Sequence, residues 1–267
     1  PQLLNPCEKE DAQECIDDDA WVAQEKYDGD RRLMHFQDGV LRSINRKGEF
    51  VGLPQETADK MQQTFGGATS YVVDGELIDN IFVAFDLLVW NNEDIRQQSV
   101  KQRWERLNTV MQSRDGLVQL AEMAVTTAQK QALFDRVKTS NGEGVVFKLR
   151  DAVYIAGRPN SGGDQLKFKF WKTATFKVGR VNAKRSVSLE LMENDAWVDV
   201  GNVTIPANAD IPKVGELIEV RYLYAYKDGS VYQPTFLRLR DDLEESACQM
   251  TQLSYKVDVS KIQSVTT

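Results

Sequence analysis

The pattern of the chain changes after Lys172, and this change limits the folds open to it. Before that point, β-rich apolar runs alternate with helical periodicity at residues 99–114 and 127–140. After it, short strands separated by turn residues follow one another, and no long helical period appears. We therefore expect an α+β domain at residues 1–172 and a small all-β domain at residues 173–267. The second domain is expected to be an antiparallel barrel or sandwich, with an OB-fold as the leading choice.

Strands are expected wherever β-branched and aromatic residues cluster between turn signals. In the first domain these runs are residues 21–27, 31–36, 40–46, 70–78, 81–90, 142–149 and 165–172. An acidic helix or cap is expected within residues 1–20. Two Asp-Gly turns, at Asp38-Gly39 and Asp228-Gly229, lie between apolar runs and predict hairpins, the second spanning residues 214–239.

Several classes of protein are disfavoured by composition. The three cysteines form no C-x-x-C pair, so neither a disulfide framework nor a zinc site is expected. The single histidine, His35, lies in an alternating apolar run, which disfavours a Ser-His-Asp hydrolase and a multi-histidine metal site. No apolar run is long enough to span a membrane, and the N-terminus lacks a signal-peptide pattern. We expect a cytoplasmic protein in a reducing compartment, without membrane contact.

The net charge of −7 hides an uneven distribution. Residues 1–25 hold eight acids against Lys9, which accounts for −7, so the remainder of the chain sums to zero. Residues 142–187 hold ten Lys or Arg against three acids, which gives +7. A local basic stretch of this kind is typical of a polyanion partner, although a solvated basic face has the same composition.

A lysine stands two residues before an Asp-Gly turn in Lys26-Tyr27-Asp28-Gly29-Asp30-Arg31. Further motifs follow it in order: Asn45-Arg46-Lys47-Gly48, Asp74-Gly75-Glu76-Leu77, Phe85-Asp86-Leu87-Leu88, Glu143-Gly144-Val145-Val146 and Leu166-Lys167-Phe168-Lys169. In this order and spacing they resemble the motifs of minimal ATP-dependent DNA ligases, within the covalent nucleotidyltransferase superfamily. The resemblance implies an adenylation domain of antiparallel sheets with flanking helices, followed by an OB-fold.

The same residue types suit self-adenylation on chemical grounds. A lysine amine that attacks the α-phosphate of ATP forms a labile phosphoramidate, provided that the amine is deprotonated. Lys26 is the expected nucleophile, and the nearby cations expected to favour its neutral form are Arg31, Lys167 and Lys169. Hard oxygen ligands are needed for Mg²⁺ or Mn²⁺, and Glu76 and Glu143 are the expected pair, with Asp28 orienting the site.

The resemblance also implies contacts to ATP and DNA. Phe85 would stack on adenine, Glu76 and Arg31 would contact the ribose, and Arg46 would touch the phosphates. Gln24 and Glu25 would approach the adenine amino group. Residues 233–242 resemble the last motif of the family. The expected duplex contacts are Lys177, Arg180, Lys184 and Arg185, together with Arg238 and Arg240 of that last motif. In that motif Tyr232 replaces the family's leading Arg and Leu243 its closing Lys.

The expected reaction seals a 5′-phosphate/3′-hydroxyl nick in duplex DNA, in replication, repair or recombination, by a protein that acts as a monomer. Only 25 residues precede Lys26, too few for the nicotinamide-recognising domain of NAD-dependent ligases, so ATP is favoured. The alternatives are an RNA ligase, a capping-type nucleotidyltransferase and a non-catalytic nucleic-acid-binding protein. The Phe85-Asp86-Leu87-Leu88 element and the barrel-like C-terminal segment favour DNA over RNA.

Overall fold

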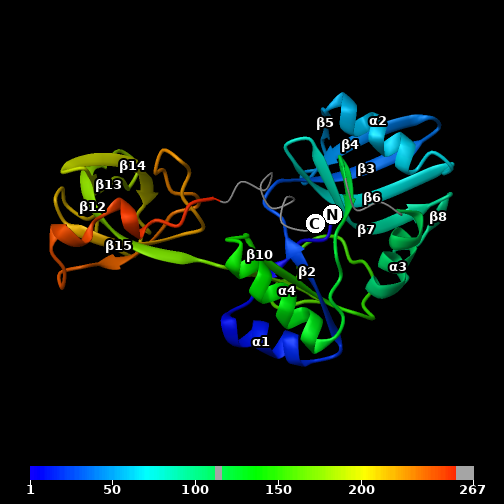
Figure 1. The fold of residues 1–267 in the computed structure, drawn as a ribbon, viewed down its shortest axis with the longest axis horizontal. Coiled ribbons are helices and arrows are strands. Elements are labelled where there is room, and N and C mark those ends of the chain that lie inside the picture. The colour runs from blue at the N-terminus through cyan, green and yellow to red at the C-terminus, as the bar shows by residue number, and fades with distance from the viewer. Residues whose placement is uncertain (112–115, 257–267) are drawn as a thin grey trace, which may run out of the picture. The chain divides into compact units, whose positions relative to one another are not determined.

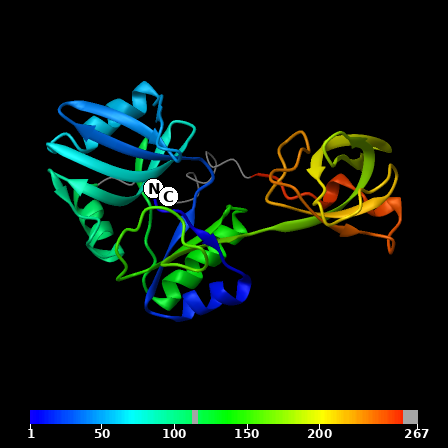
Figure 2. The same ribbon diagram turned by 180° about the vertical axis from the view of Figure 1, so that it is seen from behind.

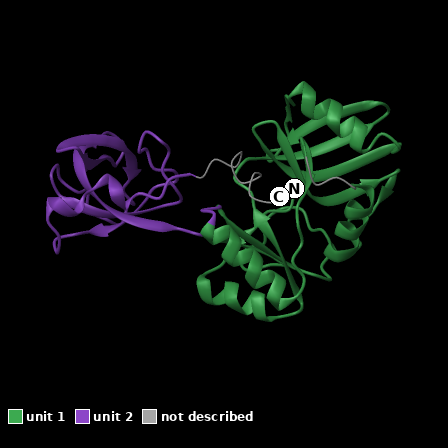
Figure 3. Cartoon of the chain, viewed as in Figure 1, with its two compact units in different colours: residues 1–139, 143–168 green, residues 140–142, 169–267 purple. Residues whose placement is uncertain are grey.

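The computed structural model describes residues 1–111 and 116–256 and divides the chain into two compact units (Figure 3). Unit 1 comprises residues 1–139 and 143–168, and unit 2 comprises residues 140–142 and the chain from Lys169 onward. The division therefore falls inside a strand, between Phe168 and Lys169. No helix in the described part of the chain has the length and apolar character needed to cross a membrane.

Unit 1 contains a four-stranded sheet that carries the lysine motif. Its order is β1 (Asn5–Pro6), β11 (Gln165–Lys169), β10 (Gly144–Leu149) and β2 (Trp21–Lys26). Helices α1 (Lys9–Asp17) and α4 (Thr127–Thr139) pack beside β2 (Figure 1). The buried Lys130 of α4 fixes this packing, because its Nζ donates to the backbone oxygens of Cys15, Asp18 and Trp21 at 3.0, 2.6 and 3.0 Å.

The second sheet of unit 1 is larger and mainly antiparallel. Its path runs β5 (Phe50–Val51), β4 (Val40–Asn45), β3 (Asp30–Gln37), β6 (Ser70–Ile78), β7 (Ile81–Trp90) and β8 (Glu93–Asp94), with β9 (Val118–Leu120) parallel to β7. Helices α2 (Gln55–Thr64) and α3 (Val100–Val110) contribute Met61 and Leu107 to the core on one face. The other face carries the charged motif residues.

Unit 2 is a five-stranded antiparallel sheet, seen from both sides in Figures 1 and 2. Its order is β14 (Ala196–Thr204), β13 (Ser186–Glu193), β12 (Lys172–Asn182), β15 (Leu217–Tyr222) and β16 (Thr235–Leu239). Short 3-10 turns at Glu245–Ala247 and Met250–Gln252 follow. Its core is separate from that of unit 1 and includes Phe176, Leu189, Val200 and Ile218, which are fully buried.

Most of the expected elements are present. The strands expected at 70–78 and 81–90 are confirmed residue for residue, and the helix expected at 127–140 ends one residue earlier. The helix expected at 99–114 ends at Val110, and residues 112–114 of that prediction lie outside the described chain.

Three expectations need correction. The single strand expected at 165–172 is two strands, because the chain breaks at Phe170-Trp171. The expected hairpin at 214–239 is a β15–β16 pair with a long connection, inside which Ala225 and Val231 bridge across the Asp-Gly turn. Helix α2 was not predicted, because Pro54 and the polar run after it offer few apolar positions.

Candidate active site

Lys26 ends β2, and its amine is bonded to a buried carboxylate. Glu143 immediately precedes β10, in which Gly144 is the register partner of Lys26. The Lys26 Nζ lies 2.5 Å from Glu143 Oε2, and the two side chains are 20% and 3% exposed. The sequence led us to expect cations around this amine, but the group in contact with it is an acid.

The turn after Lys26 depends on a glycine. A Cβ added at Gly29 would lie 2.4 Å from the backbone oxygen of Leu77, closer than real Cβ atoms approach other atoms. The Asp-Gly pair therefore brings the chain directly against β6. This close approach places β3, and with it Arg31, next to the lysine strand.

Arg31 and Asp74 form a buried ion pair on the face of the second sheet that points away from its helices. Arg31 Nε and Nη2 donate to the two oxygens of Asp74 at 2.7 and 2.6 Å. Asp74 is 0% exposed. Burial alone would lower the pKa of Arg31, but the charge and hydrogen bonds of Asp74 outweigh burial and raise it. The guanidinium is therefore fixed in position, with its Cζ 5.0 Å from the centre of the Phe85 ring.

Phe85 owes its orientation to a β-bulge. Asp74 pairs with Asp86 and Gly75 pairs with Ala84, so Phe85 is the extra residue of β7 between two consecutive pairs. A bulge of this kind redirects a side chain out of the regular alternation. Phe85 is partly exposed between the buried residues Ala84 and Asp86. It is thus an aromatic ring presented by a core strand rather than packed within the core.

Glu76 lies opposite Arg31 in the register of β3 and β6. Burial raises its pKa to about 7, against the charges of Lys26 and Arg31, and the charge of Glu143 adds to the increase. These interactions bring Glu76, Glu143 and Lys26 together in one site. Within the described residues no group of three or more His, Cys, Asp or Glu could hold a metal ion. The two glutamates alone suit Mg²⁺ when phosphate oxygens complete its coordination.

Gln24 and Glu25 have opposite surroundings, because neighbouring strand residues point to opposite faces. Gln24 shares the face of Lys26 and is 1% exposed, yet neither its Nε2 nor its Oε1 has a hydrogen-bond partner in the described chain. Glu25 lies on the other face. Burial there raises its pKa, Arg136 opposes the rise and Glu122 adds to it. Of the two side chains, only that of Gln24 is available to a ligand beside Lys26.

Lys148 is a site residue that our sequence reasoning missed. It lies on β10, is 3% exposed, and its Nζ is 5.0 Å from the Phe85 ring centre. Burial lowers its pKa to about 8, against the opposing charge of Asp86. Its side-chain amine forms no hydrogen bond or ion pair with any described residue. Its signal in the sequence is its position directly after the apolar run Val145-Val146-Phe147, because a charged residue is unusual in a buried apolar strand.

Asp86 completes the buried charge of this region. Its two oxygens accept from Arg103 Nε and Nη2 at 2.8 and 2.9 Å, and Arg103 is 0% exposed. This second pair anchors helix α3 to β7 directly beside the Phe85 bulge.

The remaining expected nucleotide contacts are less central. Arg46 is exposed in the turn after β4, which Asn45 organises by accepting from the backbone nitrogens of Lys47 and Glu49 at 2.9 and 3.0 Å. Lys167 lies on β11 next to β1 in unit 1. Lys169 belongs to unit 2, where its Nζ donates to Gln233 Oε1 at 3.0 Å.

The expected DNA contacts of unit 2 are mostly engaged within that unit. Lys177 Nζ lies 3.6 Å from the Trp197 ring centre and 3.6 Å from Glu245 Oε1. Arg185 donates to the backbone oxygens of Ile205, Pro206 and Ala209. Arg238 and Arg240 both pair with Glu219, and Arg240 also pairs with Asp242. Arg180 and Lys184 are exposed, and Arg180 donates to Asn182.

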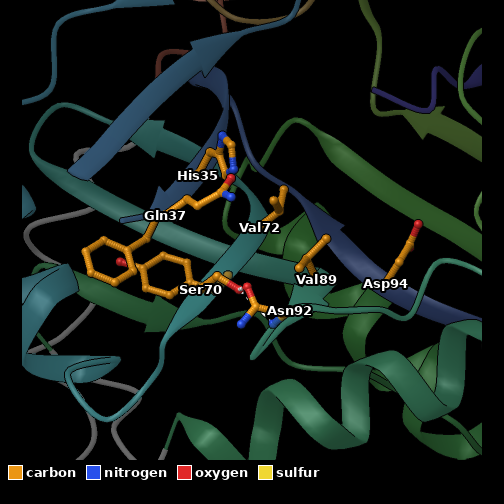
Figure 4. Close-up of a pocket in the computed structure, with 9 residues that line it drawn as sticks. His35, Gln37, Ser70, Val72, Val89, Asn92 and Asp94 are labelled. Carbon is orange, nitrogen blue, oxygen red and sulfur yellow. Dashed lines mark hydrogen bonds between the residues drawn. The ribbon is translucent and has the colours of Figure 1, made fainter. Parts of the chain in front are cut away.

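A shallow pocket of about 260 Å³ lies elsewhere on the second sheet (Figure 4). His35, Val72 and Val89 line it from adjacent strands, and Ser70 and Asn92 form a hydrogen bond of 2.9 Å at its wall. It contains none of the expected site residues. His35 is a strand residue here, as its alternating surroundings predicted.

Comparison with known proteins agrees with this geometry. The sequence model of the family described as the ATP dependent DNA ligase domain matches residues 78–169. This segment includes Phe85, Glu143 and Lys148. No curated protein matches the chain.

Solved structures of DNA ligases share the fold. A Lig E DNA ligase is 19% identical with a TM-score of 0.66, and the match covers 90% of this chain and 98% of that one. The ligase domain of LigD from M. tuberculosis is 20% identical with a TM-score of 0.54, covering 93% and 97%. A mycobacterial DNA ligase D complexed with ATP and MES gives the same values. The chain therefore shares the fold of these DNA ligase structures, and its residues 78–169 match the ATP dependent DNA ligase domain, in agreement with the resemblance seen in its motifs.

Proposed function

We propose that this protein seals 5′-phosphate/3′-hydroxyl nicks in duplex DNA, using ATP and a covalent lysyl-AMP intermediate on Lys26. The observation that carries the proposal is the Lys26–Glu143 contact in the same site as Phe85, Arg31 and the unpartnered Gln24 amide. A nucleophile, a carboxylate base to accept its proton and a surface for a nucleobase are all present.

Adenine is selected by Gln24 and Phe85 in this proposal. The Gln24 amide offers one donor and one acceptor, and adenine offers an amino donor beside a ring-nitrogen acceptor, which glutamine pairs with in two parallel hydrogen bonds. Two buried amide atoms without partners are costly, and such a base would satisfy both. Phe85 supplies the stacking surface. Arg31 is held by Asp74 so that it faces the ribose and phosphates without reorganisation.

Self-adenylation is the first step. Lys26 Nζ attacks the α-phosphorus of ATP, a P–N bond forms, the bond to the β-phosphate oxygen breaks, and pyrophosphate leaves. The ammonium of Lys26 first passes one proton to Glu143, whose Oε2 accepts a hydrogen bond from it, and the second proton, lost as the P–N bond forms, leaves with pyrophosphate. Arg31 and the buried amine of Lys148 counter the negative charge of the nucleotide.

Two further transfers complete the reaction. AMP moves from Lys26 to the 5′-phosphate of the nick, and the 3′-hydroxyl then attacks that phosphate and releases AMP. Each transfer is a displacement at phosphorus, so positioning and charge neutralisation supply most of the catalysis.

Glu76 and Glu143 would hold a divalent cation, Mg²⁺ or Mn²⁺. When bound, this cation would neutralise phosphate charge. Glu76 must be ionised to serve as a ligand, so its pKa near 7 governs that role.

Unit 2 is an OB-fold in this proposal, and unit 1 is the adenylation domain. The strand order of unit 2 supports the OB-fold assignment. Its first strand, β12, lies between β13 and β15, and the first strand of an OB-fold pairs with two others. Arg180 and Lys184 are the exposed cations suited to the DNA backbone. The enzyme is proposed to act as a monomer.

Intact-mass measurement tests the proposal. The protein is first treated with pyrophosphate to remove any AMP already bound, and then incubated with ATP and Mg²⁺. We expect a gain of one AMP that Lys26→Ala abolishes, while Lys9→Ala, at an exposed lysine of α1, retains it. Transfer to a nicked DNA duplex should exceed transfer to a nicked RNA duplex. A full AMP adduct on Lys26→Ala would refute the assigned nucleophile.

A further inference from the structure

Three tyrosines pack together around the Asp228-Gly229 turn of unit 2. Tyr224 and Tyr232 are stacked, with ring centres 4.9 Å apart and an angle of 19° between the ring planes. Tyr226 packs edge-on against both, at 5.4 and 5.9 Å. Tyr224 is buried, but Tyr226 is 41% exposed. The stacked pair therefore holds an exposed ring in a defined orientation.

More aromatic surface adjoins this cluster. The chain at 254–256 runs beside Ala225, with Ala225 N donating to Ser254 O and Lys256 N donating to Ala225 O, both at 2.8 Å. This arrangement places the exposed Tyr255 next to the turn. Trp171, partly exposed, lies at the start of β12, and Lys172 there pairs with Tyr222.

Cations accompany these rings. Lys256 Nζ lies 4.9 Å from the Tyr224 ring centre. Trp171 has two cations near its ring, Lys169 Nζ at 5.3 Å and Arg221 Cζ at 4.7 Å. Lys227 is exposed in the turn itself.

Asp228 shapes the turn, because both the backbone nitrogen and Oγ of Ser230 donate to its Oδ1, at 3.0 and 2.6 Å. We call the set Tyr226, Tyr255, Lys227 and Lys256 the aromatic surface.

We propose that the aromatic surface binds unpaired nucleotides of a DNA strand, by stacking bases on its rings and pairing its lysines with phosphates. Exposed aromatic rings among cations are the features that bind single strands without sequence preference, since every base has a stacking face. The charge is complementary to a polyanion and would repel a basic protein partner. The inference rests on the proposed function and adds to it a site for single-stranded DNA beside a nick or at an end.

Fluorescence anisotropy with a labelled single-stranded oligonucleotide tests this inference, with a fully paired duplex as the second probe. Tyr226→Leu keeps an apolar side chain but removes the stacking face, and should weaken single-strand binding about tenfold. Duplex binding should change much less. Phe50→Leu, at a 72% exposed ring in unit 1, is the matched control and should leave both affinities unchanged.

A second variant tests the charges. Lys227→Gln with Lys256→Gln should lower the slope of log affinity against log salt by about 0.7 for each lysine. The inference is overturned if the wild-type protein does not bind single strands, or if Tyr226→Leu binds them as tightly as wild type. AMP transfer to Lys26, measured on the same variants, reports separately on the proposed function and should be unchanged.

Discussion

Charged side chains have different roles in the two units. At the candidate site of unit 1 they lie in largely buried pairs, Lys26 with Glu143 and Arg31 with Asp74, around the partly exposed ring of Phe85. In unit 2 the expected DNA-binding cations lie near the surface, and four of the six pair with carboxylates or backbone oxygens of their own unit. The burial of the charged groups, rather than their number, distinguishes the candidate active site of unit 1 from the solvent-exposed surface of unit 2.

The reason is the cost of desolvation. A buried ion is favoured only where partners compensate its charge, as Arg31 does for Asp74 through two hydrogen bonds. A surface ion pair gains little and can exchange its partner for water or for a phosphate. Five experiments probe this contrast.

The largest effect on the rate of adenylation is expected when the carboxylate that contacts Lys26 is changed. Glu143→Gln retains the size of the side chain but removes the acceptor of the Lys26 proton. It should slow AMP-adduct formation by about 10²- to 10⁴-fold. Single-turnover labelling with ATP measures the rate. Glu14→Gln, exposed on α1, is the control, and a rate for Glu143→Gln near that of wild type would remove Glu143 from the mechanism.

Stability should separate the two kinds of ion pair. Asp74→Asn leaves Arg31 buried without its anion and should lower the free energy of unfolding by about 3–5 kcal/mol. Arg238→Ala breaks a pair whose arginine is 61% exposed, and should cost less than about 1 kcal/mol. Urea unfolding, followed in each unit by hydrogen exchange, measures both. Equal losses would contradict the comparison.

A pH profile tests the buried acid. The pKa of Glu76 is raised to about 7, chiefly by burial, so Glu76 is neutral below that pH and ionised above it. Because a carboxylate ligand must be ionised, adduct formation should rise about tenfold per pH unit below 7 and level off above it. Glu76→Gln should lower the rate and abolish this limb. If the wild-type rate did not change between pH 5 and pH 7, an essential ionisation of Glu76 would be excluded.

A second dependence on pH, that of ATP affinity, concerns Lys148. Its pKa is lowered to about 8, so its charge is lost as the pH rises through that value. ATP affinity should therefore weaken above pH 8 in the wild type and be independent of pH there in Lys148→Met.

The smallest effects are expected on the surface of unit 2. Arg180→Gln and Lys184→Gln should each weaken duplex binding a few-fold and reduce the salt slope by about 1. Arg185→Gln should lower the stability of unit 2 instead, because its donors hold backbone oxygens at Ile205 and Ala209. Anisotropy at several salt concentrations distinguishes the two, and an unchanged slope for Arg180→Gln would exclude a phosphate contact there.

Much of this protein was determined by its sequence. The apolar runs of β6 and β7 have the length and composition of strands, and the structure confirms both. The change of pattern after Lys172 predicts a domain boundary there, and the two compact units divide between Phe168 and Lys169. The order of the motifs also predicted the ligase fold. The residues that handle phosphate are of few types and are clustered in short motifs along the chain.

Only the tertiary structure decided how those residues meet. A bulge, which arises from pairing between β6 and β7, turns Phe85 out of the core, and the sequence of β7 alone does not reveal it. The partner of Lys26 is an acid 117 residues away, and the burial of Lys148 and its position beside Phe85 are known only from the structure. Local sequence specifies strands through side-chain pattern, whereas the charge state and orientation of a site depend on neighbours that only long-range packing supplies.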